Sequence, residues 1–127
     1  MSKRESPITR AFWKQTGGTL VEEFPVVKAG KDHARRLIDG IIILNGPMKI
    51  AKPSEVELEG MDIICIQTKA SRLGMYLMGQ ALFSKLLLEK NFNPKSVRSV
   101  ALCTKNDNVL EPLLKKFNVE VVIMDSL

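Results

Sequence analysis

Several side chains that common kinds of site require are scarce in this 127-residue sequence. With one histidine, a histidine-based metal centre or catalytic triad lacks its other members. The two cysteines, Cys65 and Cys103, lie inside apolar stretches, which predicts buried free thiols and is typical of a reducing compartment. Neither a G-x-G-x-x-G stretch nor a P-loop occurs, so a small-molecule-binding α/β domain of the dinucleotide or triphosphate kind lacks support.

Long apolar runs and biased tracts are absent as well. No run approaches the roughly 18 apolar residues of a membrane span, and no apolar segment follows the charged amino-terminal residues. The sequence therefore predicts a cytoplasmic protein without a membrane partner. The length and the 45% hydrophobic content are typical of one domain with a substantial core, so we expect a single domain over residues 1–127.

Basic residues outnumber acidic ones. The 19 Lys and Arg against 14 Asp and Glu give a formal net charge of +5. An excess of positive charge favours an anionic partner such as DNA. The alternative is an ordinary soluble surface with some excess lysine.

The hydrophobic pattern predicts eight regular elements. Helices are expected over residues 7–15, 73–90 and 108–117, and strands over 19–27, 37–44, 61–70, 97–104 and 119–124. Ser6 is the expected N-cap of the first helix, and Pro25 predicts an edge or a bulge in the first strand. The order αβββαβαβ predicts an α/β fold in which a mixed sheet carries helices on its faces.

Polar residues interrupt two apolar strands of this pattern. Asp39 lies in the run LIDGIIIL, where an unpaired carboxylate is costly, so it needs a partner or a metal ion. Gln67 and Lys69 are two residues apart near the end of the other strand and project from the same face. If the two strands pair, the three side chains converge. A metal that activates water for phosphodiester hydrolysis needs hard oxygen ligands and a nearby cation.

With these residues in this order, the chain resembles the PD-(D/E)xK nuclease superfamily, whose restriction-endonuclease-like fold includes Holliday junction resolvases. The matching residues are Ile38-Asp39-Gly40, then Gln67-Thr68-Lys69, then a helix containing Gly79-Gln80. The family's αβββαβ core is similar to residues 7–104, which leaves a C-terminal αβ extension. The resemblance implies a metal-dependent DNA endonuclease, a hydrolase in which Asp39 and Gln67 bind Mg²⁺ or Mn²⁺. It also implies that Lys69 orients the attacking water and stabilises developing charge.

The chain departs from the family pattern at two positions. Gln67 replaces the usual second carboxylate, and Ile38 replaces the proline of the motif. We expect Glu22 to supply the missing carboxylate as a catalytic residue; Glu5 and Glu23 are accessory candidates. Because Glu22 and Glu23 project to opposite faces of a strand, at most one of them is expected to line the site. A third accessory candidate, Gln80, resembles the helix glutamine of some branches; the alternative is a satisfied core amide.

Basic residues in the polar stretch before the Asp39 strand are expected to contact DNA phosphates; the alternative is a solvated loop. These candidates are Lys28, Lys31, Arg35 and Arg36, with Arg72 beyond Lys69. His33, in the same stretch, is expected on the solvated surface. A chain this short is expected to read DNA structure rather than a long sequence, and a homodimer is the expected assembly for cutting two strands.

A second hypothesis retains the same fold without catalytic activity. If Gln67 only hydrogen-bonds its neighbours, the protein is a catalytically inactive module for DNA binding or protein assembly. That hypothesis predicts no bound divalent metal and no third carboxylate near Asp39. On either hypothesis Phe12 and Trp13 are expected in the core.

Overall fold

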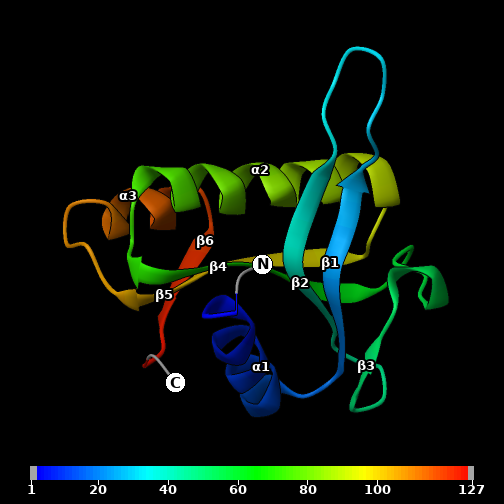
Figure 1. The fold of residues 1–127 in the computed structure, drawn as a ribbon, viewed down its shortest axis with the longest axis horizontal. Helices are drawn as coiled ribbons and strands as arrows, with labels where there is room; N and C mark the ends of the chain where they lie inside the picture. The colour runs from blue at the N-terminus through cyan, green and yellow to red at the C-terminus, as the bar shows by residue number, and fades with distance from the viewer. Residues whose placement is uncertain (1–2, 126–127) are drawn as a thin grey trace.

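The computed structural model describes residues 3–125, which form three α-helices, six strands and one 3₁₀ turn (Figure 1). Along the chain these are α1 (Glu5–Thr16), β1 (Thr19–Val27), β2 (Arg36–Ile43), β3 (Lys49–Ala51), η1 (Pro53–Glu55), β4 (Asp62–Arg72), α2 (Met75–Phe92), β5 (Ser96–Lys105), α3 (Glu111–Lys116) and β6 (Val119–Ile123).

All six strands belong to one mixed sheet in the order β3-β1-β2-β4-β5-β6. β2 pairs antiparallel with both β1 and β4, whereas the pairs β1/β3, β4/β5 and β5/β6 are parallel. α2 and α3 cover one face and α1 covers the other, and the loop between β1 and β2 projects beyond α2 (Figure 1). The predicted α/β class, with a mixed sheet between helices, is therefore confirmed.

The core lies on both faces of the two central strands. Ile41, Ile42, Ile63 and Ile64 are completely buried, as expected for strands covered on both sides. Ile42 and Ile64 meet Phe12 and Trp13 on the α1 face, whereas Ile41 and Ile63 belong to the cluster on the α2 face. Burying each isoleucine side chain stabilises the fold by roughly 1.5–3 kcal/mol, so the middle of the sheet is a rigid base for the polar residues farther along the same two strands.

The first helix begins earlier than predicted. α1 starts at Glu5, and Arg4 takes the N-cap position without a side-chain hydrogen bond, so the prediction of Ser6 as N-cap is wrong. Pro7 is tolerated in the first turn because the amide it lacks would have had no partner within the helix. A carboxylate is stabilised at a helix amino terminus, which favours inclusion of Glu5.

The strand β1 is irregular at two points. Its register shifts between Pro25 and Val27, and β3 pairs with β1 only at residues 19–21, which is consistent with the predicted edge or bulge at Pro25. Glu23 has a positive φ of 51° and is omitted from the ladder, which passes from Glu22↔Gly40 to Phe24↔Ile38. Positive φ is uncommon outside glycine, so Glu23 interrupts the regular alternation of side chains along this strand.

Cys65 and Cys103 are buried free thiols, as predicted. The chain between the predicted strands 37–44 and 61–70, where no element was predicted, contains β3, which pairs with β1 at the sheet edge, and then η1. Over residues 3–125, no helix combines the length and the apolar content needed to cross a bilayer.

Candidate functional site

The strands β2 and β4 separate at the residues that the sequence analysis selected. Their ladder runs from Ile43↔Ile63 to Gly40↔Ile66 and ends there. At the next position the backbone of Thr68 donates a hydrogen bond to Asp39 Oδ2 at 2.8 Å, and the backbone of Asp39 donates to Gln67 Oε1 at 3.3 Å. At this position, hydrogen bonds from backbone amides to side chains thus replace the backbone pairing of the two strands. We call this arrangement of Asp39, Gln67 and Thr68 the fork.

Asp39 carries a perturbed carboxyl group at the fork. Burial raises the pKa of Asp39 from 3.8 to about 6, although the hydrogen bond from Thr68 lowers it; the charges of Glu23 and Glu5 raise it further. The ion pairs within residues 3–125 are Arg10–Glu22 and Arg98–Glu120, and neither includes Asp39. A partly buried carboxylate without a basic side-chain partner is costly and marks a candidate functional group.

Gln67 is buried, with 2% of its surface exposed, and both ends of its amide make hydrogen bonds. Its Oε1 accepts from the backbone of Asp39, and its Nε2 donates to Ser84 Oγ on α2 at 2.8 Å. These bonds fix the amide between the fork and α2. Because a carbonyl oxygen accepts two hydrogen bonds, Oε1 keeps one acceptor position.

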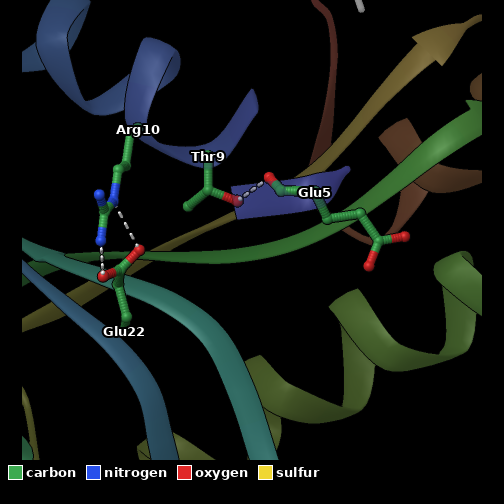
Figure 2. Close-up of polar contacts among 4 residues, drawn as sticks. All are labelled: Glu5, Thr9, Arg10 and Glu22. Atoms are coloured by element: carbon green, nitrogen blue, oxygen red, sulfur yellow. Dashed lines mark hydrogen bonds and ion pairs between the residues drawn. The ribbon is translucent and has the colours of Figure 1, made fainter. Parts of the chain in front are cut away.

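On the opposite face, Thr68 connects the fork to α1. The hydroxyl oxygens of Thr9 and Thr68 lie 2.7 Å apart, and Thr9 donates to the backbone carbonyl of Glu5 at 3.1 Å (Figure 2). Because a hydroxyl has one proton, Thr68 is the donor to Thr9. Gly40 permits this approach, since a Cβ there would lie 3.0 Å from the Thr9 methyl group.

Of the three acidic candidates, Glu5 and Glu23 act on Asp39. Glu5 Oε2 accepts from the backbone of Ala70 at 3.4 Å, just beyond Lys69 on β4. Glu23 occupies the β1 position across from Asp39, between the paired residues Glu22 and Phe24. The charges of both carboxylates raise the pKa of Asp39.

Glu22 points elsewhere. Arg10 of α1 holds both of its carboxylate oxygens, at 2.8 and 3.1 Å, and Figure 2 shows the Glu5 carboxylate directed away from this ion pair. Glu22, the carboxylate expected from the sequence to complete the site, is thus paired with Arg10, and of the two adjacent glutamates it is Glu23 whose charge raises the pKa of Asp39. The positive φ of Glu23 could not be predicted from the sequence.

The basic candidates lie on β4, on the segment that leads into β2 and at the start of β2. Lys69 is exposed and takes part in no ion pair among residues 3–125. Arg72 donates to the backbone carbonyl of Asn106 at 2.9 Å. The loop between β1 and β2 and the beginning of β2 carry the other exposed candidates, Lys28, Lys31, Arg35 and Arg36, together with His33, which is exposed as predicted.

A cleft of about 440 Å³ opens beside the fork on the α2 face. Gln67, Ser84 and the half-buried Gln80 line it, and Arg36 reaches it from β2. Gln80, selected from the sequence as an accessory candidate, is thus brought next to Gln67. Ser84 and Thr9 were missed, because nothing local distinguishes a hydroxyl that bonds a distant strand from one that bonds its own helix.

In the part of the chain that the structure describes, no group of three or more His, Cys, Asp and Glu side chains is placed to hold a metal ion. The oxygen donors at the fork are the Asp39 carboxylate and the Gln67 carboxamide. Comparisons of the chain with protein-family models, with curated proteins and with solved structures found no match. The functional argument therefore depends on the geometry of the fork.

Proposed function

We propose that the protein is a metal-dependent DNA endonuclease of the PD-(D/E)xK kind, with the fork as its catalytic centre. The observation that carries the proposal is the Asp39 carboxyl group, which is held at the strand separation with a pKa of about 6 and no ion-pair partner among residues 3–125. Gln67 lies beside it, and Lys69 follows two residues later on β4.

The order of elements supports the same proposal. α1 precedes three strands, β1, β2 and β4, that pair antiparallel in sequence, and α2 then leads to β5, which pairs parallel with β4. This is the αβββαβ order expected of a restriction-endonuclease-like core. On this view β3 is an insertion at the edge, and α3 with β6 forms the C-terminal extension.

The donor set fits an open site of the magnesium kind. Mg²⁺ retains several waters and binds through one or two carboxylates together with substrate phosphates, so it does not need a closed cage of side chains. Asp39 and Gln67 would hold the ion, with Glu23 and Glu5 adding negative charge near it. When bound, the ion would polarise the phosphate and lower the pKa of a coordinated water.

The chain's own residues would orient these groups. Thr68 holds one oxygen of the Asp39 carboxylate through its backbone amide, which leaves Oδ1 for a ligand. Ser84 fixes the Gln67 amide, and Thr9 fixes the strand behind it through the Thr68 hydroxyl. The Lys69 ammonium group would stabilise the charge that develops on the attacked phosphate.

The exposed basic residues before and on β2 would bind the DNA backbone. Lys28, Lys31, Arg35 and Arg36 carry four positive charges on a segment that projects beyond α2 (Figure 1) and leads into β2 three residues before Asp39. Phosphate contacts of this kind position a duplex without reading its sequence. They would also make binding strongly dependent on salt.

Cleavage of supercoiled plasmid and of branched DNA in Mg²⁺ or Mn²⁺ tests the proposal. We expect Asp39→Asn and Lys69→Met to abolish cutting while the proteins remain folded. Matched controls are Asp62→Asn, at the opposite end of β4, and Lys90→Met, in the last turn of α2; both should cut like the wild type. Cutting that survives both Asp39→Asn and Lys69→Met would contradict the proposal.

One observation favours a second candidate, a catalytically inactive DNA-binding module. Both polar atoms of Gln67 already make protein hydrogen bonds, so the fork is held together without a metal ion. This candidate predicts salt-sensitive DNA binding in EDTA and no cleavage with any divalent metal. The homodimer and the cytoplasmic location stay predictions; sedimentation equilibrium tests the first.

A further inference from the structure

The amino-terminal half of α2 presents aromatic side chains at the mouth of the cleft beside the fork. Tyr76 is 79% exposed and Phe83 is 61% exposed, and both line the cleft of about 440 Å³. Residues seven apart lie on one face of a helix, so the two rings are on the same side. We call this cleft, lined by Arg36, Gln67, Tyr76, Gly79, Gln80 and Phe83, the α2 cleft.

Gly79 lies between the two aromatic residues on this face of α2. Glycine in a helix interior lowers helix stability relative to alanine. Packing does not require it here, because a Cβ built at Gly79 has no heavy atom within 4 Å, and its φ is not in the left-handed region. Its effect is a gap on the helix surface between Tyr76 and Phe83, of the kind that admits a flat ring.

The polar residues of the α2 cleft have the hydrogen-bonding groups and the positive charge that suit a nucleotide. Gln80 supplies an amide group for the hydrogen-bonding edge of a heterocycle, and Arg36 supplies a positive charge. Gln67 also lines the cleft, with its amide held by Asp39 and Ser84. The volume is within the usual range for a small-molecule or nucleotide subsite. Proteins hold unpaired bases by stacking them on aromatic rings next to basic side chains that contact the phosphates.

We propose that the α2 cleft binds an unpaired nucleobase of the DNA substrate, stacked on Tyr76 or Phe83 over Gly79, with Arg36 at the adjoining phosphate. The inference rests on the proposed function, because it takes DNA as the substrate of the fork. It names the substrate class as DNA with unpaired nucleotides next to the cleavage site, such as an overhang, a gap or a flap. The side chain shared by the cleft and the fork is Gln67.

Charge favours DNA over a second copy of the chain as the occupant. Arg36 lines the cleft, Arg35 is next to it in sequence, and the whole chain has a net charge of +5. Two copies facing one another through this surface would bring like charges together, whereas a phosphate backbone neutralises them.

Fluorescence anisotropy in EDTA measures the binding without cleavage. The probes are a blunt duplex and the same duplex with a single-stranded overhang, each at one fixed salt concentration. We expect the wild type to prefer the overhang, and the substitution that removes the stacking ring, Tyr76→Ala or Phe83→Ala, to weaken overhang binding roughly 5- to 100-fold, as expected for loss of one stacked base. Blunt-duplex binding should be nearly unchanged.

Two further variants separate the cleft from general effects on the surface. Gly79→Leu should remove the overhang preference by filling the gap, and the protein should stay folded because the position faces open space. Phe117→Ala removes another exposed aromatic ring, 58% exposed at the end of α3, and should leave both affinities unchanged. Wild-type overhang binding by Tyr76→Ala, Phe83→Ala and Gly79→Leu would overturn the proposal. So would loss of a dimer in sedimentation without any loss of DNA binding, which would identify a second copy as the occupant.

The outcomes also separate this proposal from the nuclease proposal. Asp39→Asn lies outside the cleft lining, so it should lose cutting and keep the preference for the overhang. A preference without metal-dependent cutting by the wild type supports the cleft and contradicts the nuclease. Metal-dependent cutting by the wild type without a preference for the overhang supports the nuclease proposal and contradicts the cleft proposal.

Discussion

The Asp39 carboxyl group should lower the stability of the folded protein at neutral pH, and Asp39→Asn should restore it. The pKa of this group is about 6 in the fold, against an ordinary value of 3.8. At 1.36 kcal/mol for each pKa unit, the difference corresponds to about 3 kcal/mol at neutral pH. Since the group is only half-buried, we expect roughly 2 kcal/mol to be measured. Asparagine keeps the oxygen that accepts from Thr68 and carries no charge.

The pH dependence follows from the sign of the shift. Because the folded state has the higher pKa, it binds more protons than the unfolded state between about pH 4 and pH 6. The Asp39 contribution to the free energy of unfolding therefore becomes more favourable as the pH falls through this window. The stability advantage of Asp39→Asn should be largest above pH 7 and should shrink by about 2 kcal/mol by pH 4.

Urea denaturation in EDTA measures this difference. The single tryptophan, Trp13, is buried and donates its indole N–H to the carbonyl of Gly18, so its fluorescence should report unfolding. Comparing the two proteins at each pH cancels every other titrating group to first order. A difference that stays constant from pH 8 to pH 4, or an Asp39→Asn variant that is less stable at pH 8, would refute the reasoning.

Three other substitutions test the surroundings of the fork. Thr9→Val removes the hydroxyl that accepts from Thr68 and leaves a buried hydroxyl without its partner, so the free energy of unfolding should fall by about 1–3 kcal/mol; an unchanged urea midpoint would contradict the contact. Gly79→Ala should raise the free energy of unfolding by about 0.5–1 kcal/mol, because alanine stabilises a helix interior relative to glycine and its Cβ meets open space here. The same substitution should weaken overhang binding. A loss of stability would show that the Cβ clashes with a neighbouring group. Gln67→Glu adds a negative charge beside the Asp39 carboxylate and removes the hydrogen-bond donor to Ser84. The variant should therefore be less stable than the wild type in EDTA and should regain stability when Mg²⁺ binds. The same urea midpoint with and without Mg²⁺ would argue against a metal site.

The sheet was predictable from sequence because its strands have strong local patterns. β1 spans Thr19–Val27, the range that its β-branched and aromatic residues predict, and β4 is apolar on both faces until Gln67. The meeting of Asp39 with Gln67 also follows from sequence, once the two strands are taken as neighbours. Local pattern therefore predicts which residues come together.

How they come together depends on contacts that no local pattern encodes. The partner of Thr9 is 59 residues away along the chain, and a helix threonine gives no sign of such a partner. Glu23 adopts a left-handed conformation inside a strand, which its residue type does not predict. The parallel pairing of β3 with β1 depends on the path of the chain after β2, and three residues are too few to give a periodic signal.

The most direct test of the central claim is single-turnover cleavage of a labelled overhang duplex by wild-type protein and Asp39→Asn, each in excess over DNA, in Mg²⁺ and in EDTA. The account predicts cutting by the wild type in Mg²⁺ alone and a loss of at least about 100-fold in Asp39→Asn, since this variant lacks the charged metal ligand. Equal rates for the two proteins, or wild-type protein that binds the duplex and leaves it intact in Mg²⁺ and Mn²⁺, would contradict it.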